Sequence, residues 1–508
     1  MTDYPHSSDP LNSTPKHSAQ ALPPLPLSPV APYKYQQNQS ATNKGAFGFR
    51  TAHMIGVGGC GMNAIAHALL AMGIKVTGSD LKESKATLDL RKAGAVIFIG
   101  HDAENLQNPD VTIISTAIPE RNPELQRARG EGRTILHRSE ALALFLSTRE
   151  SILITGTHGK TTTSAITSIM MAAGQLNPWS FVGGYVPAFS GNCRCGGDRF
   201  AVAEADESDG TFEKLPVQHL IVTNIEDEHL DYWKTGSAMR MGFRRVYESV
   251  PETGVRLCCL DDAGVRELLS RSTLPCVGYS VQGNSAAAYS AANIDLQPFH
   301  SSFDLMMQGT FYARYTIGVP GIHNVSNAVA ALAMTNELGG DLTLVAQALK
   351  EFHGVGRRFE IKGQFNGISV IDDYGHHPTE IRVTLKAAKK AAESTNGKLI
   401  VVFQPHRYSR TRDTLSELAA SFNDASALIL LPIYSAGEKP LDGVHNDSLF
   451  LSLSPSVKKL AQYRENAREV AELLRPTLQQ GDIVLTIGAG DVYRISDELC
   501  EQLTAEGV

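Results

Sequence analysis

A glycine- and threonine-rich loop at residues 156–163, GTHGKTTT, constrains the fold of this chain more than any other feature. An apolar run at residues 152–155 directly precedes it, and a helical pattern of apolar side chains begins at residue 165. A strand, a tight loop and a helix N-terminus form a cradle in which backbone N–H groups and the helix dipole face an anion. Lys160 can neutralise phosphate oxygens, and the hydroxyl of Thr161 can bind Mg²⁺. The pattern predicts nucleoside triphosphate binding.

This loop is shorter than the common phosphate-binding loop. Four residues between the two glycines would require glycine at position 154, and the chain has Ile154 there and His158 inside the loop. An ordinary turn with a chance Gly-Lys-Thr is the alternative. The strand before the loop and the helix after it favour the phosphate cradle.

Composition limits the class of protein. At 508 residues the chain is long enough for about three domains of roughly 150 residues. Lys and Arg total 46 against 53 Asp and Glu, a net charge of -7, which argues against a nucleic-acid partner. No apolar run approaches the roughly 18 residues of a membrane span, and the N-terminus lacks a signal-peptide pattern. Seven scattered cysteines indicate a reducing compartment, so we expect a cytoplasmic protein.

Sequence patterns divide the chain into a tail and three units. Residues 1–46 are rich in Pro, Ser, Gln and Asn without apolar periodicity, which predicts a disordered tail. From there strand-like runs alternate with helical patterns, which predicts an α/β fold of three consecutive domains, each with a mostly parallel sheet and flanking helices. We expect a Rossmann-like domain at 47–148, a central P-loop ATPase-like domain at 149–353 and a second Rossmann-like domain at 354–508.

The expected strands are apolar runs bounded by turn residues. They lie at 52–57, 75–80, 95–98, 111–115, 152–155, 200–203, 219–223, 368–372, 399–403, 427–431 and 483–486. A helix is expected at 324–338, and the region before residue 320 carries mixed strand signals.

A dinucleotide fingerprint follows the first expected strand. Gly56, Gly58 and Gly61 have the G-x-G-x-x-G spacing, and Asp80 ends the next strand. On this pattern alone an NAD-linked oxidoreductase is a serious candidate. Close-approach glycines and a helix N-terminus bind any pyrophosphate, however, and Asp80 can bind any ribose, so a UDP-sugar fits as well. A glycine turn without a ligand is the third alternative.

Two acidic loops follow strands of the central unit. Residues 204–209 hold four carboxylates, which repel one another unless cations or donors compensate them. Mg²⁺ bridging the phosphates of ATP is the simplest compensator. The loop at 223–231 contains His229, which could complete a second Mg²⁺ site or be an ordinary surface histidine. A solvated acidic loop is the alternative at 204–209.

The third unit carries two polar loops at strand ends. One lies at residues 372–378 and the other at 404–411, where an open parallel sheet binds ligands. Arg407 and Arg410 offer forked donors to a carboxylate or a phosphate. Surface charge is the alternative for this pair.

Together these motifs resemble those of the Mur ligases of peptidoglycan synthesis, and the resemblance extends from about residue 50 to the C-terminus. It rests on residues 58–62, 78–80, 156–163, 204–209, 321–324 with Asn327, 356–359, 372–378 and 404–411. Two positions depart from the usual family pattern: Cys60, where alanine is more frequent, and Glu228, where Asp usually precedes the histidine.

The resemblance implies an ATP-dependent acid–amino-acid ligase. The expected reaction joins L-alanine to the carboxylate of UDP-N-acetylmuramate through an acyl phosphate, with ATP and Mg²⁺ as cofactors. A sister ligase that attaches a recovered peptide to the same UDP-sugar is the close alternative, although its first loop tends not to read Gly-Gly-x-Gly-Met. The expected partners are small molecules, and the oligomeric state stays open.

The resemblance also implies roles for individual residues. ATP is expected at Gly156, Thr157, His158, Gly159, Lys160, Thr161, Thr162, His323, Asn324, Asn327, Arg357 and Asp373. The UDP-sugar is expected at Gly56, Gly58, Gly59, Gly61, Met62, Asp80 and Ser115. The amino acid is expected at Tyr374, His376, Arg407 and Arg410, and Mg²⁺ at Thr161, Glu204 and His229. The expected catalytic residues are Lys160, His376, Arg407 and Arg410.

Overall fold

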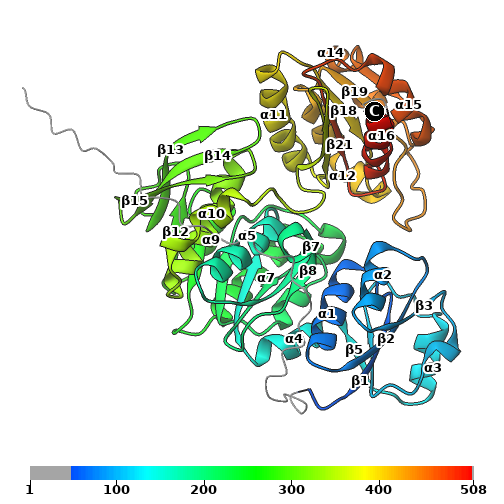
Figure 1. The fold of residues 1–508 in the computed structure, drawn as a ribbon, viewed down its shortest axis with the longest axis vertical. Coiled ribbons are helices and arrows are strands. Elements are labelled where there is room, and N and C mark those ends of the chain that lie inside the picture. The colour runs from blue at the N-terminus through cyan, green and yellow to red at the C-terminus, as the bar shows by residue number, and fades with distance from the viewer. Residues whose placement is uncertain (1–46, 506–508) are drawn as a thin grey trace, which may run out of the picture.

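The computed structural model describes residues 47–505, so the tail expected at 1–46 lies outside the described residues. Three sheets follow one another along this part of the chain, each flanked by helices (Figure 1). In Figure 1 the first sheet and its helices are blue to cyan, the central ones are cyan to green, and the third group runs from yellow to red. The predicted α/β class with mostly parallel sheets is confirmed.

The first sheet has five parallel strands in the order β3-β2-β1-β4-β5. The strand order reverses between β1 and β4, and open α/β sheets bind ligands at such a reversal. The strands are β1 (Thr51–Ile55), β2 (Lys75–Asp80), β3 (Val96–Ile99), β4 (Val111–Ile114) and β5 (Ile135–His137). The helices are α1 (Cys60–Ala71), α2 (Lys85–Lys92), α3 (Pro123–Gly130) and α4 (Arg138–Ser147).

The central sheet has ten strands in the order β15-β14-β13-β12-β11-β10-β6-β9-β7-β8. Antiparallel pairs at both edges flank a parallel centre, which accounts for the mixed strand signals before residue 320. Its strands are β6 (Glu150–Thr155), β7 (Trp179–Val186), β8 (Gly191–Arg194), β9 (Phe200–Glu204), β10 (His219–Val222), β11 (Arg256–Cys259), β12 (Val277–Ser280), β13 (Tyr289–Leu296), β14 (Ser301–Met307) and β15 (Thr310–Ile317). Its helices are α5 (Lys160–Ala173), α6 (Leu230–Trp233), α7 (Gly236–Ser249), α8 (Ala263–Ser270), α9 (Ile322–Glu337) and α10 (Ala346–Lys350).

The third sheet has six strands in the order β16-β17-β21-β18-β19-β20, of which only the β16–β17 pair is antiparallel. Its strands are β16 (Glu360–Phe365), β17 (Ile368–Asp373), β18 (Leu399–Phe403), β19 (Ala427–Leu430), β20 (Ala461–Tyr463) and β21 (Ile483–Ile487). Its helices are α11 (Pro378–Ser394), α12 (Tyr408–Ala419), α13 (Ser448–Ser452), α14 (Pro455–Lys458), α15 (Val470–Leu474) and α16 (Tyr493–Ala505).

The strands predicted from apolar runs are all present, with bounds shifted by one or two residues at most. Period-two burial explains why these runs form strands, as β6 shows. Ile152 and Ile154 point into the core that contains α5 and α9, whereas Leu153 points into the core on the opposite face. Both faces of the strand are therefore buried, as in a doubly covered parallel sheet.

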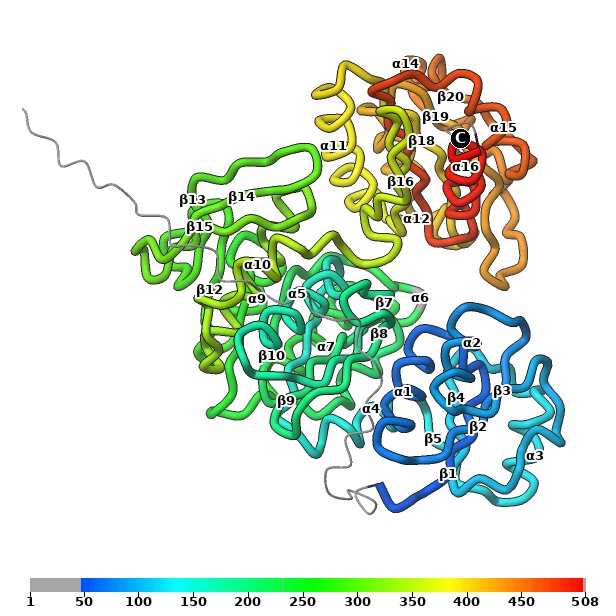
Figure 2. The backbone as a smooth tube through the Cα atoms, viewed as in Figure 1, coloured from blue at the N-terminus to red at the C-terminus, as the bar shows by residue number. Residues whose placement is uncertain are grey.

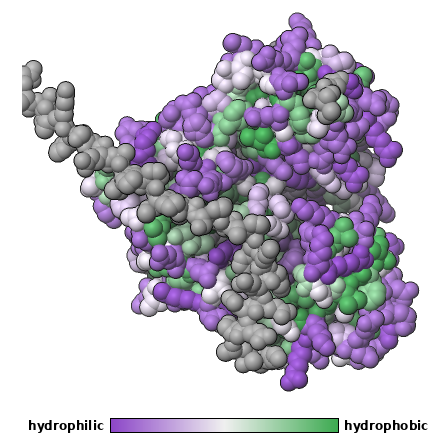
Figure 3. All heavy atoms as spheres, viewed as in Figure 1, coloured by the Kyte–Doolittle hydropathy of each residue, from purple (hydrophilic) through white to green (hydrophobic). Residues whose placement is uncertain are grey.

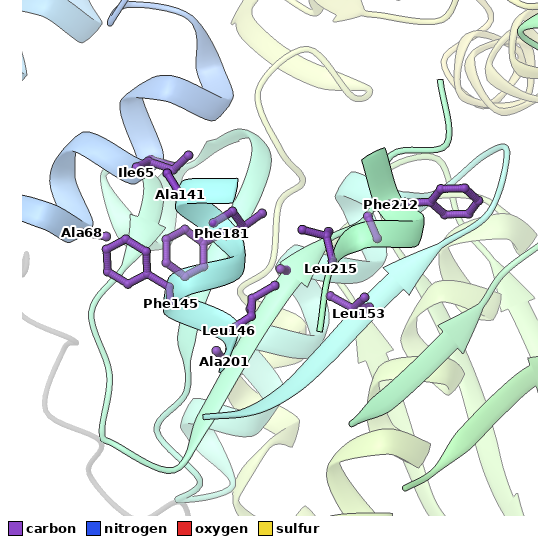
Figure 4. Close-up of a cluster of buried hydrophobic side chains, with 14 of the residues drawn as sticks. Ile65, Ala68, Ala141, Phe145, Leu146, Leu153, Phe181, Ala201, Phe212 and Leu215 are labelled. Atoms are coloured by element: carbon purple, nitrogen blue, oxygen red, sulfur yellow. The ribbon is translucent and has the colours of Figure 1, made fainter. Parts of the chain in front are cut away.

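A continuous apolar core joins the first sheet to the central one (Figure 4). The ring of Phe145, on α4, lies 5.4 Å from that of Phe181 and 6.1 Å from that of Trp179, both on β7. Ile65 of α1 belongs to the same cluster. The first sheet is thus attached through buried hydrophobic surface, which resists relative motion of the two parts.

The third sheet has cores of its own on its two faces. Phe299, from the β13–β14 connection, packs against one of them, and Lys390 of α11 donates to the carbonyl oxygen of Leu296. Figure 2 shows α11 facing this hairpin. The other contacts with the central part, described below, are largely polar and lie at the candidate site.

Polar residues cover most of the face shown in Figure 3. Within residues 47–505, no helix has the length and apolar character needed to cross a membrane.

We predict that Phe145→Ala lowers the free energy of unfolding by about 3–5 kcal/mol, because it removes a buried ring at the joint between two sheets. Urea unfolding followed by circular dichroism measures this, with exposed Ser147→Ala on the same helix as the matched control. A change below about 1 kcal/mol would show that the joint does not depend on this ring.

Candidate active site

The phosphate cradle connects β6 to α5. Gly156 has φ +138°, and a Cβ atom there would lie 2.1 Å from Oγ1 of Thr223, so only glycine fits. Gly159, at φ +81°, precedes the helix, and no side chain caps its N-terminus. The first N–H groups of α5 therefore lack a side-chain acceptor, which is the geometry that binds an anion.

Asn224 holds the cradle in shape. Its side-chain oxygen accepts from the N–H of His158 at 2.7 Å, and its backbone oxygen accepts from that of Thr157 at 3.1 Å. The hydroxyl of Thr223 donates to the carbonyl of His158 at 2.7 Å. The loop is thus fixed from β10 before any ligand binds, which lowers the cost of binding.

Lys160 is buried against a carboxylate. Its Nζ lies 2.9 Å from Oε2 of Glu207 and donates to the carbonyl oxygens of Gly156 at 2.7 Å and Thr157 at 3.0 Å. Side-chain exposure is 11% for Lys160 and 0% for Glu207. Burial alone would lower the pKa of Lys160, but Glu207 and Asp206 raise it overall, so the lysine is charged. Burial raises the pKa of Glu207 to about 7 despite the attraction of Lys160.

Thr161 and Glu204, two of the three predicted Mg²⁺ ligands, are adjacent. The hydroxyl of Thr161 donates to Oε1 of Glu204 at 2.9 Å, and the N–H of Gly183 donates to Oε2 at 2.8 Å. A hydroxyl and a carboxylate at the end of the cradle are oxygen donors of the kind Mg²⁺ prefers.

The third predicted ligand, His229, lies in a second group of donors. One nitrogen of His229, one oxygen of Asp206 and one oxygen of Glu207 all lie within 4.8 Å of one another. Burial lowers the pKa of His229, so the imidazole is neutral and able to bind a metal. Both groups of donors fit a divalent cation, and the metal roles of these residues stay a prediction.

A cavity of about 350 Å³ opens between the central and third sheets. Of the residues predicted to bind ATP, those that line it are His158, Gly159, Thr162, His323, Asn324, Asn327 and Asp373. Nδ1 of His323 is buried without a hydrogen-bond partner, and burial lowers the pKa of His323 to about 4. A buried polar atom of this kind fits a ligand donor or acceptor inside the cavity.

His158 bridges the two sides of this cavity. Its ring nitrogens lie 3.5 Å from Oε2 of Glu226 and 3.4 Å from Oε1 of Glu380, on α11. Burial alone would lower the pKa of His158, but the two carboxylates more than compensate and raise it to about 10. A charged loop histidine therefore ties the cradle to the third sheet.

The two arginines after Gly356 have different surroundings. Arg357, predicted to contact ATP, does not line the cavity: it donates to Asp372 at 3.0 Å and to the carbonyl oxygen of Gly488 at 2.6 Å. Its φ of +61° lies in the left-handed region. Arg358 lines the cavity instead.

Asp373, the predicted ribose contact, is buried in the cavity wall. It accepts from the N–H groups of Phe359 and Gly375, each at 2.7 Å. Burial raises the pKa of Asp373 to about 6. Each oxygen keeps a lone pair for a ligand.

The predicted amino-acid residues converge beside this cavity. Nη1 of Arg410 lies 3.2 Å from Nδ1 of His406, and Arg407 donates from Nε to Glu438 at 2.6 Å. The rings of Tyr374 and His376 meet edge to face at 5.5 Å. Burial lowers the pKa of His376 to about 4. The arrangement offers a neutral imidazole near the guanidinium group of Arg410.

The predicted UDP-sugar loop lies at the strand reversal of the first sheet. The N–H of Gly58 donates to Oδ2 of Asp80 at 2.9 Å, Gly59 precedes α1, and Ser115 follows β4 across the reversal. Gly56 has φ +76°, and the missing Cβ of Gly61 leaves room for the guanidinium of Arg138. The side chain of Met62 is buried in the core, so only its backbone can face a ligand here.

Cys60 connects this loop to the phosphate cradle. Its Sγ lies 3.0 Å from the carbonyl oxygen of Gly183, whose N–H binds Glu204. The side-chain amide of Asn192 donates to the carbonyl oxygen of Cys60. The first and central sheets therefore present their ligand loops to one another.

Several residues of the site were not predicted individually. Asn224, Glu207 and Glu228 lay inside motifs that the sequence singled out, whereas Arg138, Glu380 and Glu438 lay in ordinary helical or loop sequence. Charge and position in a strand-end loop were signals for the first three. Nothing local in the sequence distinguished the others.

Three family models match the chain in order. They are described as the Mur ligase family catalytic domain at residues 51–150, the Mur ligase middle domain at 154–335, and the Mur ligase glutamate ligase domain at 357–490.

Curated relatives match over most of their length. The UDP-N-acetylmuramate–L-alanine ligase of Pelotomaculum thermopropionicum is 42% identical over 454 residues, 89% of this chain and 98% of the relative. The enzyme of the same name from Brucella ovis is 40% identical over 460 residues, 89% of this chain and 97% of the relative.

Solved structures share the fold. A UDP-N-acetylmuramate-alanine ligase from Thermotoga maritima superposes with a TM-score of 0.77 at 31% identity, covering 90% of this chain and 99% of that one. A murein peptide ligase from Psychrobacter arcticus gives a TM-score of 0.67 at 23% identity, covering 89% and 98%, and indicates the fold alone.

We predict opposite titrations for two histidines of the site. His158 should stay charged until the pH nears 10, and His376 should stay neutral above a pH of about 4. Because the pKa of His158 is raised on folding, its contribution to stability is complete below about 6.5 and is lost as the pH rises through 10. Histidine NMR titration measures both, with His158→Gln and His376→Gln to assign the signals. A pKa of His158 near 6.5 would contradict its ion pairing with Glu226 and Glu380.

Proposed function

The chain belongs to the Mur ligase family, and we infer that it joins L-alanine to the carboxylate of UDP-N-acetylmuramate at the expense of ATP. The observation that carries this conclusion is the meeting of a preformed phosphate cradle with an arginine-rich loop of another sheet. The cavity between the cradle and the third sheet is bordered by His158 on one side and by Glu380 and Arg358 on the other. Arg410 of the arginine-rich loop lies 3.5 Å from Glu228 in the loop that follows β10, so this loop also meets the central part.

ATP is proposed to bind with its phosphates on the cradle and its nucleoside in the cavity. Gly156 and Gly159 allow the close approach, and the first N–H groups of α5 face the phosphates. The unpaired Nδ1 of His323 and the carboxylate of Asp373 supply polar contacts in the cavity wall. Asn327 accepts from the hydroxyl of Thr163 at 3.0 Å and so aligns α9 with α5.

The reaction proceeds in two steps. A carboxylate oxygen of the muramyl group attacks the γ-phosphorus of ATP, the bond to the β–γ bridging oxygen breaks, and ADP leaves. The free amine of L-alanine then attacks the acyl phosphate carbon, the bond to the phosphate oxygen breaks, and phosphate leaves with an amide formed. Lys160 stabilises the charge that moves onto the transferred phosphoryl group.

Mg²⁺ is proposed at Thr161 and Glu204, and a second ion at His229 with Asp206, where the ions would neutralise phosphate charge. The N–H of Gly183 and the hydroxyl of Thr161 orient Glu204 for this role. The UDP-sugar is proposed on the glycine loop of the first sheet. Support comes from Cys60 in that loop, which contacts the carbonyl oxygen of Gly183. The N–H of Gly183 donates to Glu204, so Gly183 alone connects the loop with Glu204.

On the third sheet, Arg407 and Arg410 are proposed to hold the carboxylate of alanine. Their forked donors match a carboxylate, and Glu438 fixes the orientation of Arg407. Neutral His376 lies between Tyr374 and His406, where it can orient the amine or accept a proton.

The two alternatives are weaker. Relatives at 40% identity or more carry the name of the alanine ligase, whereas the murein peptide ligase likeness shows only the fold. An NAD-linked oxidoreductase would have no use for the phosphate cradle. We place the protein in the cytoplasm, where ATP is available and where its seven unpaired cysteines stay reduced.

A phosphate-release assay tests the function. The protein with ATP, Mg²⁺ and UDP-N-acetylmuramate should release phosphate steadily only when L-alanine is added. Release that ignores L-alanine, or that needs a peptide in its place, would contradict the assignment.

We predict that Lys160→Ala lowers kcat at least about 10²-fold, because the variant loses the preorganised positive charge that stabilises the transferred phosphoryl group. The single variant also leaves buried Glu207 without its cation and should lower Tm. Lys160→Ala combined with Glu207→Gln should recover Tm and leave kcat low. A double variant with kcat within a few-fold of the wild type would contradict the role of Lys160.

A further inference from the structure

Glu228 lies where the central and third sheets meet, in the loop between β10 and α6. Its Oε1 is 3.5 Å from Nη2 of Arg410 and 3.9 Å from Nε2 of His376, and its Oε2 is 3.9 Å from Nε2 of His229. The side chain is only 10% exposed. A largely buried carboxylate of the central part therefore faces the amino-acid loops of the third sheet.

The contacts of Glu228 are too long to satisfy it. Among the described residues, none donates a hydrogen bond to its carboxylate, and its nearest cation stays at 3.5 Å. The other carboxylates of the site are closely bound: Glu438 accepts from Arg407 at 2.6 Å, and Glu207 is 2.9 Å from Lys160. A carboxylate accepts about four hydrogen bonds. Glu228, at 10% side-chain exposure, therefore keeps acceptor capacity that a ligand donor beside Arg410 can use.

We propose that Glu228 binds the α-ammonium group of the incoming amino acid while Arg410 binds its carboxylate. The proposal rests on the function given above and adds a binding residue to it. The two charged groups of an α-amino acid are separated by a single carbon atom, and Glu228 and Arg410 are close enough to bind one each. The substrate takes the place of their direct ion contact.

This arrangement has a consequence for recognition. The carboxylate is bound from the third sheet and the ammonium group from the central part, so the amino acid links the two. The site binds the α-carboxylate and the α-ammonium group, which all α-amino acids share. Its affinity is therefore lower for a carboxylic acid that has no amine.

Glu228→Gln tests the proposal, because it keeps the shape and removes the charge. The KM for L-alanine should rise on the order of 10- to 100-fold, as expected for losing a charge-assisted hydrogen bond. The KM values for ATP and UDP-N-acetylmuramate should stay within about twofold. Glu228→Asp keeps the charge and should recover part of the loss. Asp227→Asn, the neighbouring carboxylate at 48% side-chain exposure, is the matched control and should behave as the wild type.

L-lactate provides a second measurement. It carries a hydroxyl in place of the ammonium group, so it should inhibit the wild type weakly compared with the affinity for L-alanine. In Glu228→Gln the ratio of the lactate Ki to the alanine KM should fall at least about tenfold. A role limited to folding would lower Tm without changing this ratio.

The outcomes separate this proposal from the function. A wild-type protein without alanine-dependent phosphate release would overturn the function itself. An active wild type with an unchanged alanine KM in Glu228→Gln would overturn only the role of Glu228. A variant that needs more Mg²⁺ but binds alanine normally would also overturn it, because Glu228 would then act with His229 on the metal.

Discussion

Carboxylates in the loops that follow the strands of the central sheet are paired with cations, and these ion contacts organise the rest of the site. Glu207 is paired with Lys160, Glu226 with His158, and Glu228 faces Arg410. Glu207 is fully buried and would be costly without its cation, whereas Glu226 keeps 37% of its side chain exposed. Two of these cations, Lys160 and His158, belong to the phosphate cradle itself. Arg410 comes from the third sheet, so the third sheet completes the charge balance of the central one.

The two joints between the sheets differ in kind. The first sheet is held through an apolar core around Phe145, whereas the third meets the central part through charged groups and the small contact of Phe299. Polar interfaces between domains permit relative motion more readily than apolar ones. We therefore expect the third sheet to be the part that moves when ATP and the amino acid bind. That motion would change the distance from His158 to Glu380, because His158 lies between Glu226 and Glu380.

Much of this architecture could be predicted from the sequence, because apolar runs and glycine positions are local signals. The strand ahead of the cradle, Gly156, and the fingerprint around Gly58 are of this kind. Contacts between distant segments were not predictable. His158 meets Glu380 from the third sheet, and Lys160 is buried against Glu207.

The nucleotide contact that the resemblance implies for Arg357 stays a prediction. Arg357 has a φ of +61°, and its neighbour Arg358 lines the cavity. Side-chain direction at such a position depends on dihedral angles that residue type alone does not determine. The antiparallel strands β13 to β15 at one edge of the central sheet were also not predicted individually, because their sequences gave only mixed strand signals.

Transfer of an oxygen isotope tests the central claim, that the acid is activated by phosphorylation at this cradle. UDP-N-acetylmuramate labelled with ¹⁸O in its muramyl carboxylate is incubated with the protein, ATP, Mg²⁺ and L-alanine. Mass spectrometry then measures the ¹⁸O content of the released phosphate and of the amide product. An acyl phosphate route transfers one labelled oxygen to the released inorganic phosphate and leaves the other in the amide. Unlabelled phosphate, or label in AMP, would contradict the account.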